Sequence, residues 1–338
     1  MTLPLKSPAF VERAFGLDLL SIVVPVHNEA AVLTAFHERL MQVMDELPLA
    51  VEVVYVDDGS SDPSPKILRQ LRMRDTRVAV LELSRNFGKE AAMTAGLDHA
   101  GGDAIVVIDA DLQDPPELIA DMVAAWREGY DVVVARRTHR DGESGFKKLS
   151  SKLFYRTLNR VSAVPIPVDV GDFRLMSRRA VEALKRLPER NRYMKGLFAW
   201  VGFPQKELLY VREARHAGRS QWGFWKLVGL ALDGLTSFTW APLRVATVVG
   251  VLVAAGALTM GGFILVKTLL YGDPVPGYPS LMCMVLFLGG MQLLAIGIQG
   301  EYLGRLFVES KQRPIYLLKN WQPAASVNRA FRSRERAA

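Results

Sequence analysis

The first 135 residues alternate between short apolar runs and longer segments in which apolar residues recur at helical spacing. The apolar runs are Leu19–Val26, Val51–Val56, Val78–Leu83, Ala104–Ile108 and Val132–Ala135. Helical periodicity lies between them, at about residues 30–46, 64–74, 89–100 and 116–128. This alternation predicts an α/β fold with a mostly parallel sheet that is covered by helices on both faces. Ligands of such folds bind beyond the carboxyl ends of the strands.

The last third of the chain has a different pattern, with two long apolar stretches that carry no charge. Ala246–Val266 has 21 residues and Leu281–Gly300 has 20. At about 1.5 Å per residue, each is long enough to cross the roughly 30 Å hydrocarbon core of a bilayer as a helix. Neither has the polar face that a buried helix of a soluble protein usually shows. We therefore expect two transmembrane helices.

An apolar stripe at helical spacing precedes these stretches. It covers residues 222–240 and has aromatic residues at both ends. This pattern is typical of an amphipathic helix that lies in the membrane interface. A helix packed on the soluble part of the chain would show the same stripe.

The charges around the two apolar stretches predict their orientation. The loop Tyr271–Pro279 between them contains Asp273 but no Lys or Arg, whereas both outer flanks are basic. Positive charge marks the cytoplasmic side, and the N-terminus lacks an apolar signal segment. We expect a multi-pass protein of the inner (cytoplasmic) membrane with both termini in the cytoplasm.

Charge is also uneven along the soluble part, although the net charge of the whole chain is only +7. Residues 1–135 carry 22 acidic and 11 basic side chains, whereas residues 136–226 carry 21 basic and 8 acidic ones. An acidic half beside a basic half favours a cation on one side and anionic ligands on the other. An unevenly charged solvated surface is the simpler alternative. We expect no nucleic-acid partner.

Several common site classes are excluded by composition. Cys283 is the only cysteine, which excludes a disulfide scaffold and a cysteine-ligated metal centre. The five histidines show no HxxxH or HExxH spacing, and neither GxGxxG nor GxxxxGK[ST] occurs. The commonest dinucleotide and P-loop sites are therefore absent from the sequence.

The motif Asp109-Ala110-Asp111-Leu112-Gln113 follows the fourth apolar run. Two carboxylates separated by one residue can converge on one Mg²⁺ or Mn²⁺ ion, and diphosphate oxygens can complete the ligand shell. Such an ion would neutralise the charge that develops on a departing diphosphate. A solvated turn is the alternative for so short a pattern.

Two further polar clusters follow the first two apolar runs. Asp57 and Asp58 precede a Gly-Ser pair, and Asn28 and Glu29 follow the first run. Carboxylates accept hydrogen bonds from base N–H and ribose hydroxyl groups. The alternatives are an Asx turn in which Ser60 caps the next helix, and a helix cap by Asn28.

A basic cluster follows the third apolar run. Arg85 and Lys89 lie where a strand is expected to give way to a helix. A helix N-terminus with two nearby cations suits a phosphate group. A solvated basic turn is the alternative.

These motifs together resemble glycosyltransferase family 2, which has a GT-A nucleotide-sugar-binding fold. The resemblance is carried by VVPVHNE at 23–29, VDDGS at 56–60, SRNFGKE at 84–90 and DADLQDPPE at 109–117. Later motifs are similar to those of polyprenyl-phosphate glycosyltransferases, such as dolichyl-phosphate mannose synthase and the bacterial undecaprenyl-phosphate enzymes with two C-terminal spans. These are VGDFRLMSR at 170–178, GRS at 218–220, GEYLGR at 300–305 and RPIY at 313–316.

The resemblance implies a domain organisation for the whole chain. An N-terminal extension is expected first, followed by a cytoplasmic GT-A catalytic domain, the interfacial helix, the two transmembrane helices and a basic cytoplasmic tail. The corresponding ranges are 1–18, 19–221, 222–240, 241–308 and 309–338.

The resemblance also implies roles for individual residues, each at a position that matches a family motif. The nucleotide-binding residues are Pro25, Asn28, Glu29, Asp57, Asp58, Lys89 and Asp109. The Mg²⁺ or Mn²⁺ ligands are Asp109, Asp111 and Gln113. The residues that hold the acceptor phosphate are Arg136 or Arg137, Lys147 or Lys148, Ser151 and Arg215. The catalytic residues are Asp111, Asp172 and Arg174, where Asp172 orients a sugar hydroxyl, pairs with Arg174 to shape the acceptor site, or assists as a base.

The activity that the resemblance implies is transfer of a sugar from a nucleotide donor to a polyprenyl phosphate, with inversion at the anomeric carbon. A UDP-sugar and undecaprenyl phosphate are the expected substrates, and the product would serve cell-envelope glycans or lipid modification. A phosphate acceptor needs no strong base, because its second pKa lies near 6. Two alternatives stay open: a processive polysaccharide synthase of the same family, although no QxxRW motif occurs, and a non-catalytic scaffold that binds nucleotide sugars. A homotetramer is also compatible with the resemblance.

Overall fold

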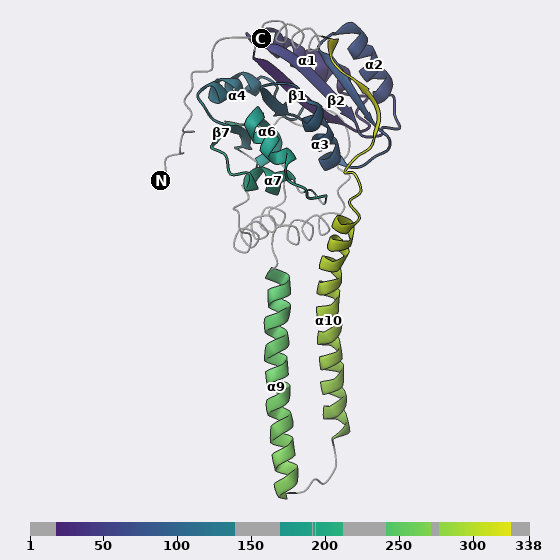
Figure 1. Cartoon of the computed structure of the whole chain (residues 1–338), viewed down its shortest axis with the longest axis vertical. Helices are drawn as coiled ribbons and strands as arrows, with labels where there is room; N and C mark the ends of the chain where they lie inside the picture. Colours follow the sequence, from purple (N-terminus) through teal and green to yellow (C-terminus); the bar gives the residue numbers. More distant parts are fainter. Residues whose placement is uncertain are drawn as a thin grey trace.

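The structure is a computed structural model that describes residues 18–138, 170–190, 192, 194–211, 241–271 and 277–325. These residues form an α/β part from which two long helices, α9 and α10, extend side by side in one direction (Figure 1). The expected interfacial helix at 222–240 and the expected acceptor residues Lys147, Lys148, Ser151 and Arg215 lie outside the described residues.

The α/β part is built on one eight-stranded sheet in the order β7-β5-β6-β4-β1-β2-β3-β8. Strands β4, β1, β2 and β3 are mutually parallel, and β5 is parallel to β7. Strand β6 runs antiparallel to β4 and β5, and β8 runs antiparallel to β3. The bounds are β1 (Leu19–Val26), β2 (Ala50–Asp57), β3 (Val78–Leu83), β4 (Ala104–Val107), β5 (Val132–Arg137), β6 (Val170–Ser177), β7 (Gln205–Tyr210) and β8 (Leu318–Gln322).

Helices cover both faces of this sheet. Four of them connect the first five strands: α1 (Leu33–Asp45), α2 (Ser64–Arg74), α3 (Lys89–His99) and α4 (Leu118–Arg127). Two more follow β6: α6 (Arg178–Lys185) and α7 (Met194–Trp200). The five strands and four helices that the apolar pattern predicts are all confirmed, with small shifts at their ends.

Two apolar clusters explain why the central strands have nearly continuous apolar sequences. Phe36 and Trp126 pack on one face of the sheet, together with Tyr55 of β2. Met93 and Phe198 pack on the other face. Because neighbouring side chains of a strand point to opposite faces, both must be apolar when both faces are covered. Each large apolar side chain buried in this way contributes about 1.5–3 kcal/mol to stability.

The two long helices are α9 (Ala241–Tyr271) and α10 (Tyr278–Ser310). Within the described residues, one segment is long and apolar enough to count as a candidate membrane span, Ala246–Tyr271 of α9. Helix α10 is also long and exposes large apolar side chains, among them Leu293 and Ile296. One span is thus supported by length and composition.

The chain returns to the α/β part after α10. Residues 318–322, which lie in the expected basic tail, form β8 at the edge of the sheet beside β3. The Ser84 amide donates to Leu317 O at 2.9 Å, and the Tyr316 hydroxyl donates to Asp98 at 2.9 Å. The chain that follows α10 is therefore attached next to the end of β3 and at the last turn of α3.

Candidate functional site

The Asp109–Gln113 turn follows β4 at the carboxyl edge of the sheet. Ala110 and Leu112 are buried, whereas Asp109, Asp111 and Gln113 are half-buried. Leu112 has φ of 59°, a left-handed conformation that costs a non-glycine residue about 1–2 kcal/mol and is frequent at functional sites. The Asp111 carboxylate accepts a hydrogen bond from the backbone N–H of Gln113 at 3.1 Å. This strained turn buries its apolar residues and leaves three oxygen-bearing side chains partly accessible.

Lys89 joins this turn to strand β6. It is the first residue of α3, and its ammonium group lies 2.7 Å from a carboxylate oxygen of Asp109 and 2.6 Å from one of Asp172. Burial alone would lower the pKa of Lys89, but Asp109 and Asp172 raise it well above its usual range. Lys89 is therefore a fixed positive charge between two carboxylates that are far apart in the sequence.

One carboxylate oxygen of Asp172 has no hydrogen-bond partner in the described part of the chain. Burial raises the pKa of its carboxyl group, but Lys89 and then Lys195 outweigh that effect and hold the pKa well below its usual range. Asp172 is therefore ionised at neutral pH. Its Oδ1 atom is buried and has no hydrogen-bond partner among the residues that the structure describes. Because a buried acceptor without a partner is costly, this oxygen suits a donor group of a ligand.

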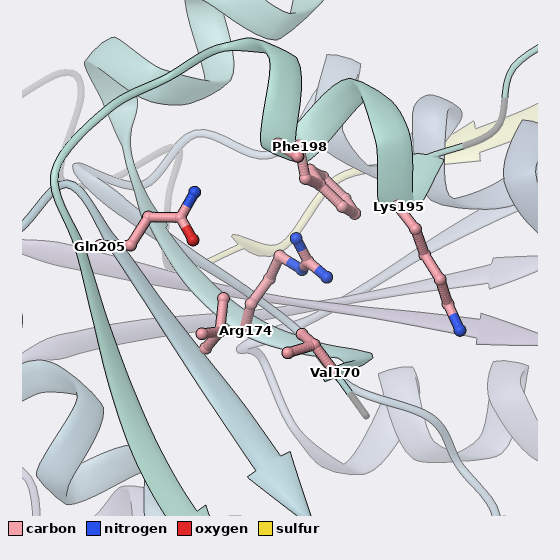
Figure 2. Close-up of a pocket in the computed structure, with 7 residues that line it drawn as sticks. Val170, Arg174, Lys195, Phe198 and Gln205 are labelled. Carbon is pink, nitrogen blue, oxygen red and sulfur yellow. The ribbon is translucent and has the colours of Figure 1, made fainter. Parts of the chain in front are cut away.

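Arg174 contacts the backbone that carries Asp172. It donates to Gly171 O at 2.7 Å and to Asp172 O at 3.4 Å, and its guanidinium lies 3.7 Å from the ring centre of Phe198. Burial lowers the pKa of Arg174 to about 10, so it stays charged at neutral pH. Both hydrogen bonds of Arg174 therefore hold the backbone at residues 171 and 172. Figure 2 shows Arg174 in a narrow pocket between Phe198 and Val170.

The polar residues after β1 and β2 form hydrogen bonds within and between the loops that follow the strands. Asp57 accepts from the Ser60 amide at 3.1 Å, an Asx-type turn. Asp58, which is buried, accepts from the amides of Phe87 and Gly88 at 2.7 and 2.9 Å. Both carboxylates therefore shape the loops at the site, whatever further contact they make.

Asn28 and Gly59 complete this set of loops. Asn28 accepts from the Ser61 amide at 2.8 Å, so it holds the loop before α2, whereas the N-cap of α1 is Val32. Gly59 has φ of 63°, and a Cβ there would lie 2.5 Å from the carbonyl carbon of Arg85. Only glycine allows the second and third strand-end loops to come so close.

Pro25 and Glu29 belong to the same region. Pro25 is half-buried in β1, where it pairs with Val56 of β2. The Glu29 amide donates to the Ser64 hydroxyl at 3.0 Å, and Glu29 O accepts from the amide of Leu33. All predicted nucleotide-binding residues thus lie at or beside the carboxyl ends of β1, β2 and β4 or at the start of α3.

The adjacent residues Arg136 and Arg137 at the end of β5 have different partners. Arg137 donates to the Tyr210 hydroxyl at 3.2 Å, and its guanidinium lies beside Gly171, the residue before Asp172. Burial lowers the pKa of Arg137, but Tyr210 and nearby carboxylates, Asp109 among them, raise it overall. Arg136 pairs instead with Glu207 at 2.8 Å, and both side chains are well exposed. Of the two, the structure brings Arg137 to the site.

The Asp109–Gln113 turn suits a hard divalent ion but does not surround one. Among the described residues, no group of three or more His, Cys, Asp or Glu side chains is placed to hold a metal ion. Two carboxylates and one amide oxygen are the ligand types that Mg²⁺ and Mn²⁺ prefer. The donor set therefore fits such an ion if a ligand supplies the missing oxygens.

Comparison with known proteins identifies the family. A family model described as Glycosyl transferase family 2 matches residues 21–185, and one described as GtrB C-terminal hairpin matches residues 241–306. An uncharacterized glycosyltransferase of Synechocystis sp. is 48% identical over 89% of this chain and 95% of the relative. The chain belongs to glycosyltransferase family 2.

A second relative matches over a similar length, and a solved structure matches over a smaller part of the chain. The bactoprenol glucosyl transferase of Shigella phage SfV is 46% identical over 89% of this chain and 98% of the relative. Among solved structures, glucosyl-3-phosphoglycerate synthase from Mycobacterium tuberculosis, in complex with Mn²⁺, UDP and phosphoglyceric acid, is 19% identical, covers 65% of this chain and 76% of that one, and has a TM-score of 0.45. The family 2 match extends from β1 to α6 of the α/β part, and the hairpin match covers α9 and most of α10.

Two residues of this family 2 site received no role from sequence reasoning, Glu90 and Lys195. Glu90 accepts from the Met194 amide at 3.2 Å, and burial followed by the charge of Asp172 raises its pKa to about 7. Lys195 lies on α7, and its charge acts on both Asp172 and Glu90. Its place next to Lys89 in the motif SRNFGKE could have identified Glu90 as a site candidate. The position of Lys195 depends on how α7 packs, which no motif indicates.

Proposed function

We propose that this protein transfers a sugar from a nucleoside diphosphate sugar to the phosphate of a polyprenol, with a divalent ion and with inversion at the anomeric carbon. One observation carries the proposal: Lys89 brings Asp109 of the donor turn and Asp172 of β6 to one point. The similarity to the bactoprenol glucosyl transferase of Shigella phage SfV supports a polyprenyl-phosphate acceptor. A UDP-sugar and undecaprenyl phosphate are the simplest substrate pair.

Donor binding is assigned to the loops at the strand ends. Pro25, Asn28, Glu29, Asp57 and Asp58 would surround the nucleoside. Asp109, Asp111 and Gln113 would hold the ion together with diphosphate oxygens, and the ion would supply positive charge to the departing nucleoside diphosphate. Lys89 contributes a second positive charge beside the same group.

The chemistry requires one substitution. An oxygen of the acceptor phosphate forms a bond to the anomeric carbon, while the bond from that carbon to the diphosphate oxygen breaks and the nucleoside diphosphate leaves. The phosphate is largely dianionic at neutral pH and needs no strong base. Asp172 is a poor base because its pKa is held well below its usual range. We assign its unpaired Oδ1 to a sugar hydroxyl, so that it orients the donor.

The acceptor phosphate would approach from the side of Arg137. Arg136, Lys147, Lys148, Ser151 and Arg215 stay candidate ligands for it, and the basic segment 136–226 would attract an anionic membrane surface at about 1 kcal/mol per nearby Lys or Arg. Helices α9 and α10 would both span the membrane as a hairpin, with both chain termini on the cytoplasmic side. Helix α7 lies at the end of the α/β part nearest these helices (Figure 1), where a lipid headgroup would be.

The direct test is product formation by the full-length protein in detergent. The protein would be incubated with undecaprenyl phosphate, Mg²⁺ or Mn²⁺ and a panel of UDP- and GDP-sugars, and the lipids analysed by mass spectrometry. We expect one lipid whose mass increases by one sugar residue. Asp111→Asn should lose at least 100-fold of this activity, whereas Asp121→Asn on the exposed face of α4 should retain it.

Three results would contradict the proposal. They are no lipid-linked sugar with any donor, a polymer in place of a single added sugar, and an unchanged rate in excess chelator. The first would favour a non-catalytic binding protein, and the second a processive synthase. The third would remove the ion from the mechanism.

A further inference from the structure

Lys195 is a cation beside the transfer site that the mechanism above does not use. We propose that its ammonium group binds a phosphate group of a substrate next to Asp172, either the diphosphate of the donor or the phosphate of the lipid. The inference rests on the proposed function and adds a ligand-binding residue to it.

The position of Lys195 is fixed by the start of α7. The amide of Met194, the preceding residue, donates to Glu90 at 3.2 Å, and Met194 itself is fully buried. Glu90 follows Lys89 at the first turn of α3. Helix α7 is thereby attached to the same helix end that carries the central lysine of the site, so Lys195 stands at a defined place beside it.

The Lys195 side chain is near enough to Asp172 for its charge to act on that carboxylate. Its charge lowers the pKa of the Asp172 carboxyl group and of the Glu90 carboxyl group. Lys195 also lines the pocket that contains Arg174 and Phe198. Figure 2 shows its side chain extending from α7 along the edge of this pocket, with the ammonium group directed away from the ring of Phe198.

The other cations of the site already have partners. Lys89 lies between Asp109 and Asp172, and Arg174 is held by backbone carbonyls and the face of Phe198. Arg137 donates to Tyr210. By contrast, no hydrogen bond or ion pair joins the half-buried Lys195 to any residue in the described ranges. Its half-buried ammonium group has lost part of its hydration, and the nearby charges of Asp172 and Glu90 do not replace the lost hydrogen bonds.

A phosphate group is the ligand that this arrangement favours. The carboxylates of Asp109, Asp172 and Glu90 lie around Lys89 and act on one region of the site, and an arriving dianion would be repelled unless further positive charge faced it. An ammonium group on a flexible stem binds phosphate as a point charge and follows it as it moves. The transfer reaction brings two phosphate-bearing substrates to Asp172, and either could meet Lys195.

The test compares Lys195→Met, which removes the charge, with Lys195→Arg, which keeps it, in the full-length protein in detergent. Lys66→Met serves as the matched control because Lys66 is an exposed lysine of α2 outside the site. UDP binding with Mn²⁺ would be measured by calorimetry. The KM for undecaprenyl phosphate would be measured at saturating donor, and thermal unfolding would be recorded for every variant.

We expect Lys195→Met to weaken one of the two ligands by about 10- to 100-fold, the range for a charged hydrogen bond. A selective loss of UDP affinity assigns Lys195 to the donor diphosphate, and a selective rise in the acceptor KM assigns it to the lipid phosphate. Lys195→Arg should recover most of the loss, and Lys66→Met should match the wild type.

Two outcomes would overturn the inference. One is a change of less than twofold in both quantities. The other is a loss in Lys195→Met that is accompanied by a lowered unfolding temperature and is not recovered in Lys195→Arg, which would indicate a structural role. The calorimetric comparison remains decisive for UDP even if the wild type forms no lipid-linked sugar, so failure of the proposed function and failure of this inference are separate results.

Discussion

Replacing Lys89 by methionine would remove the positive charge that holds Asp109 and Asp172 together. The ammonium nitrogen lies 2.7 and 2.6 Å from their oxygens. At an effective dielectric constant of about 20, each contact has a Coulomb energy of about 6 kcal/mol before hydration is counted. The Lys89 side chain is 42% exposed, however, so water offsets most of this attraction. We expect a net loss of about 1–3 kcal/mol.

This loss should be seen in both stability and activity. The same charge faces the donor diphosphate in the proposed mechanism, so 1–3 kcal/mol corresponds to a fall of about 5- to 150-fold in kcat/KM for the donor. The assay is initial-rate transfer at limiting donor, with Lys66→Met as the control. Lys89→Arg should retain more activity than Lys89→Met, because it keeps the charge with altered geometry.

The stability effect of Lys89→Met should depend on pH. Lys89 helps to hold the pKa of Asp172 below its ordinary value of 3.8, so the stabilisation is present above that value and is lost as pH falls towards the depressed pKa. The difference in unfolding temperature between wild type and variant should be full at pH 7 and shrink below about pH 4. A difference that is equal at both pH values, or a loss of activity no larger than that of Lys66→Met, would refute the reasoning.

Three further changes test other parts of the site. Gly59→Ala should lower the unfolding temperature and weaken UDP binding measured by calorimetry, because φ is positive there and the new Cβ would lie 2.5 Å from the backbone of Arg85. Phe198→Leu should cost about 1–3 kcal/mol through lost packing and the lost contact with Arg174, measured as a lowered unfolding temperature with reduced turnover. Burial raises the pKa of Glu52, so its contribution to stability is full below about pH 4.5 and is lost as pH rises through the raised value. Glu52→Gln should remove this dependence, which unfolding temperatures between pH 4.5 and 7.5 would show.

The central strands could be predicted from the sequence because they are buried on both faces. Leu19–Val26 and Val78–Leu83 have the same bounds in the pattern and in the structure. Strand β6 was not predicted as a strand, because Gly171, Asp172 and Arg174 interrupt its apolar pattern. Strand β8 is polar and exposed, and it forms through pairing with β3 after the chain has returned from α10. Such pairing depends on tertiary structure and leaves no periodic signal.

The candidate site could likewise be predicted from the sequence only in part. Motifs at strand ends predicted which residues would gather, because parallel strands end at one edge of the sheet. Motif spacing alone could not predict the contact between Lys89 and Asp172, because Asp172 lies 83 residues further along the chain. It also could not choose between Arg136 and Arg137, since the choice depends on the contacts that β7 offers through Glu207 and Tyr210. The role of Arg174 behind Asp172 likewise depends on the packing of Phe198.

The most direct test of the central claim is to identify the nucleotide and the lipid that the full-length protein releases in one reaction. Chromatography would identify the nucleotide, and mass spectrometry would count the phosphorus atoms of the lipid product. Attack of a lipid phosphate on the anomeric carbon predicts a nucleoside diphosphate and a lipid in which one phosphate joins the polyprenol to the sugar. A nucleoside monophosphate with a two-phosphate lipid would show that the bond between the two phosphates breaks instead, and would contradict the account.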